Sequence, residues 1–265
     1  MLKQWLRELL PVTLQVPAKY VINAWRGQLE PELKLLRLLV KPGDHAIDVG
    51  GNRGVYAYAL SRLGAKVEVF EPNPVCAKVV EPWASDKKTV VLHKVALSDT
   101  EGVAELHIPI DDAGIEHDAS ASLEHADFTS VRNESVALRT LDSFAFEQVG
   151  FVKIDVEGHE FNVLRGGENL LRNQRPSVLV EIEQRHSQRP INEIFGLLMG
   201  WGFQGFFLDA GRLTPLASFD LARDQRMEDF AGRSGRYINN FLFLHEDRLA
   251  QGNYTSLFHE WGGAQ

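Results

Sequence analysis

The chain is poor in three features that would narrow its class: cysteine, positive charge and long apolar runs. Cys76 is the single cysteine, so an internal disulfide and a cysteine-rich metal site are both excluded. The formal net charge is −8, which argues against a nucleic-acid partner because such proteins gain affinity by neutralising phosphates. No apolar run approaches the roughly 20 residues needed to cross a bilayer. We therefore expect a cytoplasmic protein without stable membrane insertion.

The organisation of the chain indicates one α/β domain without repeats or linkers. Residues 1–14 carry apolar residues at helical spacing, interrupted by charges, which favours a packing helix over a signal peptide; contact with a membrane surface is the alternative. We expect an N-terminal helical segment over 1–44, a main domain over 45–247 and a C-terminal tail over 248–265.

Short strands alternate with helical patterns through the main domain. Strands are expected at residues 45–49, 66–70, 90–95, 103–108, 136–139, 151–155, 177–182, 203–208 and 240–244, and helices at 32–40, 55–63, 73–83, 160–171 and 191–199. The segment 109–135 is expected to be irregular, and the charge-rich segment 223–236 to be a solvated face. Such alternation predicts a Rossmann-like, mostly parallel sheet with helices on both faces. Ligands of such sheets bind at the carboxyl ends of the strands.

A glycine loop, DVGGNRG at 48–54, follows the first of these strands. A dinucleotide site requires G-x-G-x-x-G, and the spacing of these glycines does not supply it. A class I S-adenosylmethionine (SAM) site has an acid at the end of the first strand followed by G-x-x-x-G, which Asp48, Gly50 and Gly54 supply. We expect Asp48, Gly50, Asn52 and Gly54 to bind the cofactor.

The chemistry of SAM explains this choice of residues. Glycines let the backbone approach a ligand closely, the helix N-terminus after them favours a carboxylate, and Asp48 suits an ammonium group. Glu71 ends the next strand, where a carboxylate can accept hydrogen bonds from both ribose hydroxyls. The alternative is that these residues are turn glycines and surface acids.

The segment Phe151–Gly167, FVKIDVEGHEFNVLRGG, resembles the FkbM family of SAM-dependent methyltransferases. Further blocks that are similar to this family lie at 29–32 (LEPE), 48–54 (DVGGNRG), 69–74 (VFEPNP), 96–99 (ALSD) and 140–143 (TLDS). The resemblance covers about residues 29–183 and implies a class I fold with a final antiparallel strand. It also implies methyl transfer to a hydroxyl of a sugar, glycan or secondary metabolite.

The sequence departs from the family pattern in three places. Gly51 stands where alanine is usual, and the segment 109–135 and the residues after Asp247 match poorly. These departures leave the choice of acceptor open.

Methyl transfer to a hydroxyl requires alignment of the reacting atoms and a group that takes the proton. Asp155, Glu157 and His159 follow the strand that points toward the methyl group in this architecture, so they are the candidate catalytic residues. The alternative is that they only shape a strand-to-helix turn. Ser98, or Asp99, is expected to meet the adenine. Glu181 could join Asp155 in a Mg²⁺ site, but we expect no metal.

Two absences agree with a small-molecule or glycan acceptor. The strand end reads Ile154-Asp155-Val156, not the Asn/Asp-Pro-Pro-aromatic turn of base-amine methylation, and Cys76 follows the second strand, not the fourth. Two other functions stay open: a methyltransferase-like binding or scaffold protein without turnover, and an NAD-linked oxidoreductase, which the glycine spacing disfavours. The sequence leaves the oligomeric state open.

Overall fold

A computed structural model gives the structure of the chain. It describes residues 10–111, 114–117, 120–124, 130–187, 189–232 and 236–262, without the side chains of 230–232. The sequence-predicted helix over 1–14 therefore lies mostly outside the described residues.

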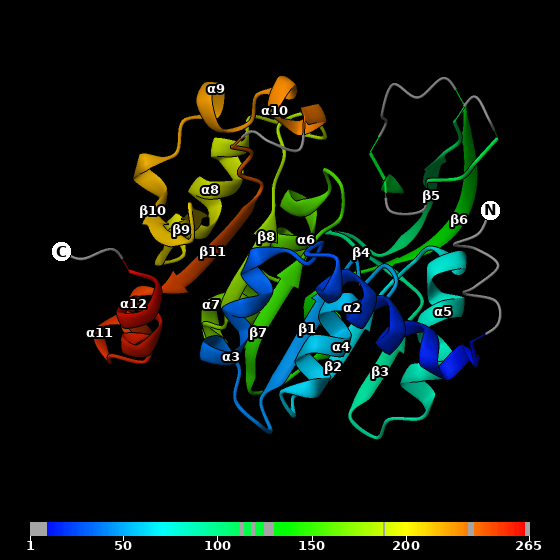
Figure 1. Cartoon of the computed structure of the whole chain (residues 1–265), viewed down its shortest axis with the longest axis horizontal. Coiled ribbons are helices and arrows are strands. Elements are labelled where there is room, and N and C mark those ends of the chain that lie inside the picture. The colour runs from blue at the N-terminus through cyan, green and yellow to red at the C-terminus, as the bar shows by residue number, and fades with distance from the viewer. Residues whose placement is uncertain are drawn as a thin grey trace.

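An eight-stranded sheet forms the centre of the molecule, in the order β10-β9-β11-β8-β7-β1-β2-β3 (Figure 1). Its strands are β1 (His45–Val49), β2 (Lys66–Phe70), β3 (Val90–His93), β7 (Val149–Ile154), β8 (Ser177–Glu181), β9 (Phe203–Asp209), β10 (Arg212–Pro215) and β11 (Asn240–His245). The five strands from β8 to β3 are parallel, β11 runs antiparallel to both neighbours, and β10 is antiparallel to β9. This is the mostly parallel sheet with a late antiparallel strand that the sequence predicts.

Helices cover both faces of this sheet, with α2 and α4 on the near face in Figure 1. The α-helices are α2 (Gln15–Trp25), α3 (Leu36–Leu39), α4 (Val55–Arg62), α5 (Pro74–Ser85), α6 (Glu160–Gly166), α7 (Glu168–Gln174), α8 (Ile191–Gly200), α9 (Leu221–Asp224), α10 (Met227–Gly232), α11 (Glu246–Ala250) and α12 (Thr255–Trp261). Short 3₁₀ turns are η1 (Val12–Leu14), η2 (Pro31–Lys34), η4 (Leu141–Phe144) and η5 (Leu216–Ser218). Covering both faces buries the apolar runs of the central strands.

A second, three-stranded sheet rises beside the carboxyl ends of β1 and β2 and corrects the sequence prediction in two places. It consists of β4 (Ala96–Leu97), β5 (Gly102–Pro109) and β6 (Val131–Arg139) in the order β4-β6-β5. The strand expected at 90–95 ends at His93, because the chain leaves the main sheet there. The prediction of an irregular segment over 109–135 is wrong at its end, because β6 begins at Val131 and pairs with β5.

The C-terminal half holds two further corrections. Asp224, expected on a solvated face, is fully buried and pairs with Arg223 and Arg236 at 2.8 and 3.1 Å. In the segment 248–265, expected as a tail, the described residues are folded. Leu257 of α12 and the preceding Tyr254 are buried in the apolar core.

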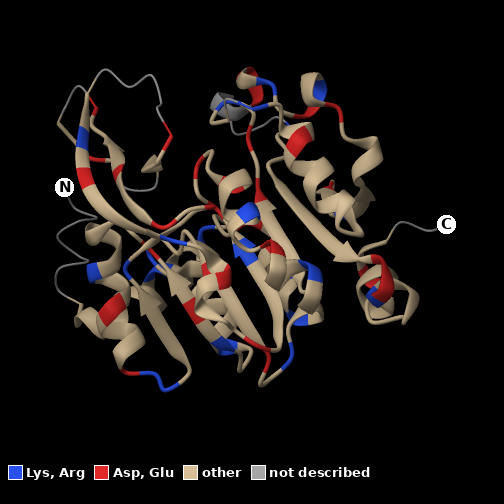
Figure 2. Cartoon of the chain, turned by 180° about the vertical axis from the view of Figure 1, so that it is seen from behind, with Lys and Arg blue, Asp and Glu red and all other residues tan. Residues whose placement is uncertain are grey.

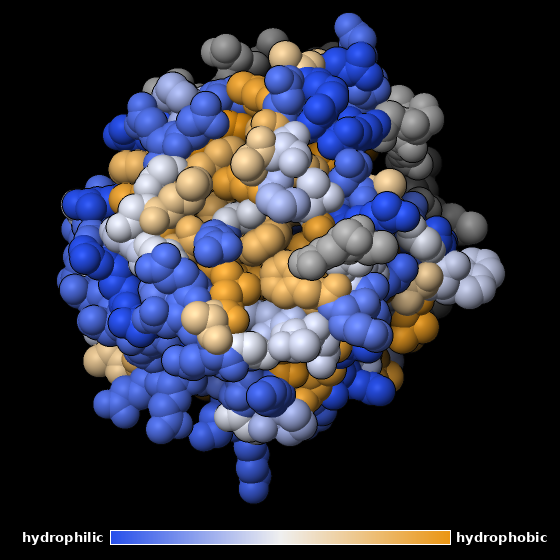
Figure 3. Space-filling model, turned by 90° about the vertical axis from the view of Figure 1, so that its left-hand side faces the viewer, coloured by the Kyte–Doolittle hydropathy of each residue, from blue (hydrophilic) through white to orange (hydrophobic). Residues whose placement is uncertain are grey.

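Charged residues of both signs are spread along the chain, and one side of the molecule has an apolar area. Lys and Arg are interspersed with Asp and Glu over the back of the molecule (Figure 2). The side on which β10 and α12 lie exposes apolar atoms surrounded by hydrophilic ones (Figure 3). None of the helices in the described part of the chain has the length and apolar character of a membrane span.

Candidate active site

The glycine loop forms a tight bridge from β1 to α4 at the carboxyl edge of the main sheet. Gly50 has φ of 76°, and a Cβ atom there would lie 1.7 Å from the carbonyl oxygen of Asp155, so only glycine fits. The amides of Gly50 and Gly51 donate to the carbonyl oxygen of Phe70 at 2.9 and 3.0 Å. Asn52 has φ of 45°, a left-handed conformation that asparagine tolerates. The loop is therefore held against the ends of β2 and β7.

Glu71 follows β2 and fixes this loop from the other side. Its Oε2 accepts a hydrogen bond from the amide of Asn52 at 2.6 Å, and its Oε1 accepts one from the amide of Asn73 at 2.7 Å. Burial raises the pKa of Glu71 to about 7, and the charges of Asp48 and Asp155 act in the same direction, against the two amides. Each carboxyl oxygen has two lone pairs, so each can still accept a ligand hydroxyl.

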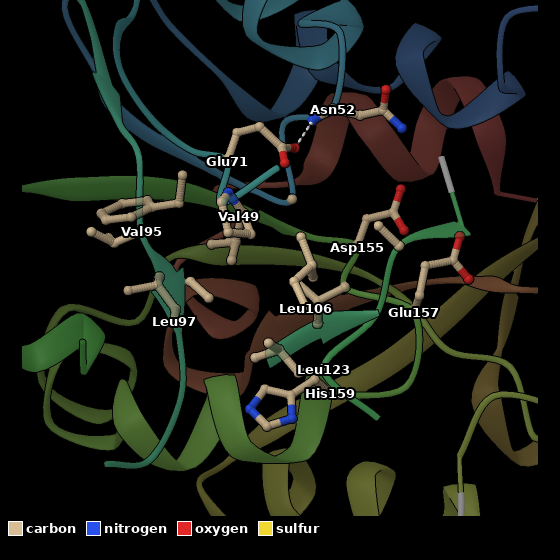
Figure 4. Close-up of a pocket in the computed structure, with 16 residues that line it drawn as sticks. Val49, Asn52, Glu71, Val95, Leu97, Leu106, Leu123, Asp155, Glu157 and His159 are labelled. Carbon is tan, nitrogen blue, oxygen red and sulfur yellow. Dashed lines mark hydrogen bonds between the residues drawn. The ribbon is translucent and has the colours of Figure 1, made fainter. Parts of the chain in front are cut away.

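A pocket opens between the glycine loop and the three-stranded sheet (Figure 4). Its empty volume, including the opening to solvent, is about 610 Å³. Val95, Leu97, Leu106 and Leu123 supply apolar side chains. The carboxyl groups of Asp155 and Glu157 lie together at another side of it, as Figure 4 shows. The pocket thus has one apolar part and one acidic part.

A second cavity lies beyond the glycine loop and shares Gly50, Asn52 and Asp155 with the first. Its empty volume is about 620 Å³, and polar residues including Asp48 line it. Among the described residues, the Oδ2 atom of Asp48 has no hydrogen-bond partner, although the residue is almost fully buried. Burial raises the pKa of Asp48 to about 7, while Lys153 lowers it. A buried acceptor without a donor is costly, so a ligand donor at this position would stabilise the site.

Lys153 is the charged centre below this cavity. Its side chain is 1% exposed, and its Nζ lies 3.8 Å from Asp155 Oδ2 and 4.0 Å from Glu181 Oε2. The same nitrogen donates to Asn240 Oδ1 at 3.2 Å. Burial alone would lower its pKa, but the surrounding carboxylates, Asp155 and Glu181 foremost, raise the pKa of Lys153 above its usual value.

Asp155 and Glu181 form a carboxyl pair at the ends of β7 and β8. Burial raises the pKa of both groups, and the charge of Asp155 raises the pKa of Glu181 further, so the pair favours holding one proton. Asn239 donates to Glu181 Oε1 at 2.6 Å and orients it. The Asp155 side chain keeps 30% of its surface exposed, so it can reach a ligand.

Glu157 lies beyond this pair, at a left-handed φ of 50°. Its Oε2 is 3.2 Å from His186 Nε2. Burial raises the pKa of Glu157 to about 8, and burial lowers the pKa of His186. Both shifts favour the neutral forms of the two groups.

His159 is hydrogen-bonded at both ring nitrogens. Nδ1 lies 2.7 Å from Glu124 Oε1, and Nε2 lies 2.9 Å from Ser98 Oγ. The residue therefore connects the insert between β5 and β6 to the chain after β4. Ser122 Oγ makes a second connection, because it donates to the carbonyl oxygen of Glu157 at 2.6 Å.

The structure thus brings most of the sequence-predicted residues to one place. Asp48, Gly50, Asn52, Glu71, Asp155, Glu157 and His159 all line the two cavities, and Gly54 is the N-cap of α4 directly beside them. Ser98 is buried behind His159, and its neighbours Ala96 and Leu97 line the pocket instead. Within the described part of the chain, no three His, Cys, Asp or Glu side chains are placed to hold a metal ion together.

Sequence reasoning missed several residues that complete the site. Glu30 accepts a hydrogen bond from Tyr56 at 2.6 Å and lies within 3.4 Å of Asn240 Nδ2. From the segment expected to be irregular, Leu123 lines the pocket and Glu124 contacts His159. In the sequence, the signal for Glu30 was its place in the LEPE block at 29–32, before the first strand.

The sheet order, the glycine loop and an acid at the end of β2 define a class I methyltransferase fold with a divided ligand pocket. A family model described as "Methyltransferase FkbM domain" matches residues 48–206. The chain belongs to this family and is a methyltransferase, which excludes the NAD-linked oxidoreductase alternative.

Three curated relatives are similar to the chain. The 2-O-methyltransferase NoeI of Sinorhizobium fredii is 27% identical over 215 residues, covering 74% of this chain and 88% of the relative. The 31-O-demethyl-FK506 methyltransferase FkbM of Streptomyces tacrolimicus is 28% identical over 200 residues, covering 62% and 74%. The hexuronic acid methyltransferase AglP of Haloferax volcanii is 32% identical over 173 residues, covering 61% and 67%.

Among solved structures, the chain is similar to a methyltransferase FkbM from Methylobacillus flagellatus. The identity is 13% and the TM-score 0.48, and the match covers 91% of this chain but 57% of the other.

Proposed function

We propose that the protein transfers a methyl group from SAM to a hydroxyl of a sugar, glycan or secondary metabolite. The observation that carries this proposal is the meeting of an apolar and a polar cavity at Gly50, Asn52 and Asp155. SAM has the same division, an adenosine at one end and an amino acid at the other. The names of the three relatives support oxygen as the acceptor atom and sugars among the acceptors.

The residues present fit this cofactor. The apolar part formed by Leu97, Leu106 and Leu123 suits an adenine ring, and Glu71 would accept hydrogen bonds from the ribose hydroxyls. The unpartnered Oδ2 of Asp48 would accept the ammonium group, which removes the cost of its burial. When bound, SAM supplies an electrophilic methyl group.

Asp155 is the proposed proton acceptor for the acceptor hydroxyl. Two neighbouring carboxyls favour one protonated and one ionised group, so the ionised member of the Asp155–Glu181 pair can accept a proton. Lys153 stabilises the negative charge of the pair and is itself buried. Glu157, with a pKa of about 8, is a second candidate, and it shares the acidic side of the pocket.

His159, also a sequence-predicted catalytic residue, has a different proposed role. Both of its ring nitrogens are already hydrogen-bonded, so it has no free acceptor for a substrate proton. We assign it as a positioning residue that holds the insert over the cofactor pocket.

Isothermal titration calorimetry with SAM, S-adenosylhomocysteine (SAH) and NAD tests the cofactor. We expect micromolar affinity for SAM and SAH and none for NAD; no SAM binding at millimolar concentration would refute the proposal. Labelled SAM and a cell extract then test turnover, with Asp155→Asn as the inactive variant and Glu246→Gln, an exposed acid at the opposite edge of the sheet, as the matched control. A scaffold protein would bind SAH and transfer no label.

The remaining partner and location assignments stay predictions. We expect a small-molecule or glycan acceptor and no nucleic acid, in agreement with the mixed charges of Figure 2. The cytoplasm is the expected compartment because the single cysteine, Cys76, is buried and forms no disulfide.

A further inference from the structure

A third cavity adjoins the site at the carboxyl end of β8 and the start of β11. Its empty volume is about 510 Å³. It is lined by Glu30, Pro31, Glu32, Glu181, Leu208, Tyr237, Ile238, Asn239 and Asn240. Glu30 also lines the cavity beyond the glycine loop, and Glu181 lies with Asp155 beside the buried Lys153. The cavity therefore borders the carboxyl pair to which we assign proton transfer.

The walls of this cavity are rigid and rich in hydrogen-bonding atoms. Glu30 is fixed by Tyr56, and Asn239 holds Glu181. Asn240 accepts from Lys153 through its Oδ1 atom, which links the cavity wall to the charged centre. Carboxyl and amide groups in fixed positions are suited to the hydroxyl groups of a polyol, because each can accept a hydrogen bond from one.

Glu32 is the residue of this cavity that most favours a bound ligand. It is 7% exposed, and it lines the cavity. Burial, aided by the charge of Glu30, raises the pKa of Glu32 to about 7, against its own backbone amide. Burial of a carboxyl destabilises the folded protein where its hydrogen bonds do not replace those to water, and a ligand hydroxyl would reduce that cost.

The charge of the cavity restricts the ligand. None of the described residues that line it is Lys, Arg or His, whereas three are Glu. Two cations of neighbouring segments are engaged by other groups: Lys153 lies beside Asp155 and Glu181, and Arg185 forms two hydrogen bonds to Glu183 at 2.6 and 3.0 Å. A ligand carboxylate would therefore meet like charges without a compensating cation.

We propose that this cavity binds the acceptor, and that the acceptor is a polyhydroxyl compound without negative charge, recognised through Glu32. The inference rests on the proposed function and narrows it. It separates this protein from its relative named as a hexuronic acid methyltransferase, whose acceptor carries a carboxylate.

Matched pairs of glycosides test the proposal, each pair consisting of a neutral sugar and its uronic acid with the same free ring hydroxyls. Label transfer from SAM is measured at pH 8, where Glu32 is mostly ionised. We expect kcat/KM to be at least tenfold higher for the neutral member. A uronic member used as well as its neutral partner would overturn the proposal, and so would transfer to neither member by a protein that binds SAH.

Glu32→Gln removes the charge of the side chain and keeps its shape. We expect the neutral-to-uronic ratio to shrink at least threefold in this variant, with SAH affinity within twofold of the original protein. Glu246→Gln, the matched control, should keep the full ratio. An unchanged ratio in Glu32→Gln would overturn the role of Glu32. If the original protein did not bind SAH, that result would instead refute the proposed function.

Discussion

Replacing His159 by alanine separates a positioning role from a catalytic one. The change removes the contact with Glu124 at 2.7 Å and the contact with Ser98 at 2.9 Å. A hydrogen bond to a charged group contributes about 1.5–3 kcal/mol, and a neutral one about 0.5–1.5 kcal/mol. The Glu124 side chain is 29% exposed and regains water, which offsets part of the loss. We therefore expect the free energy of unfolding to fall by about 2–3 kcal/mol.

The His159→Ala change should also weaken cofactor binding. Ala121 and Leu123 line the pocket, and the segment that carries them is anchored by Ser122 on one side and Glu124 on the other. Loss of one anchor should reduce SAH affinity about tenfold, which corresponds to about 1.4 kcal/mol.

Calorimetry with SAH, thermal unfolding and kcat at saturating SAM measure these effects together. We expect kcat to fall less than threefold, and Glu124→Gln to show the same effects at smaller size, because its amide oxygen can still accept from His159. A His159→Ala variant with unchanged SAH affinity and kcat reduced by about 10²–10⁴, the usual contribution of a general base, would refute the positioning role.

Three further predictions concern the carboxyl groups. Glu71→Gln places an amide NH₂ against one of two backbone donors and should weaken SAH binding by about 1.5–3 kcal/mol in calorimetry; an unchanged affinity would show that the ribose lies elsewhere. Asp155→Asn should lower kcat by about 10²–10⁴ while SAH affinity stays within threefold; normal turnover would move the base to another group. Burial raises the pKa of Asp48 and Glu71 to about 7 and that of Glu157 to about 8, so the folded protein keeps protons that the unfolded chain releases near its ordinary values. The free energy of unfolding should therefore fall as the pH rises from 5.5 to 8.5. Scanning calorimetry at a series of pH values tests this, and a thermal midpoint that rises over this range would contradict it.

The parts of the fold that could be predicted are those with local signals. The strands β1 and β2 are buried apolar runs, and their bounds agree with the sequence prediction. The break between α6 and α7 was visible at Gly166-Gly167, where a Cβ at Gly166 would lie 1.9 Å from the Ser98 carbonyl oxygen. Glycine at this position reflects close packing that the sequence marks directly.

The parts that could not be predicted depend on contacts between distant segments. Most residues at the start of β6, from Val131, are exposed or half-buried, so the strand has no apolar pattern and exists through pairing with β5. His159 meets Glu124 and Ser98 across 35 and 61 positions of the chain. No spacing rule connects such residues, and the role of His159 changes once its partners are known.

The location of the third cavity has a consequence for how acceptor preference diverges among related enzymes. The family model matches residues 48–206, which contain the glycine loop, Glu71 and Asp155. Glu30, Glu32, Tyr237 and the two asparagines after it lie outside that range, on the segment before β1 and the segment leading into β11. The residues expected to hold the cofactor and most of those that line the third cavity therefore lie in different parts of the chain. A few substitutions in two short stretches can redirect the enzyme to a new acceptor while the methyl-donor half stays intact.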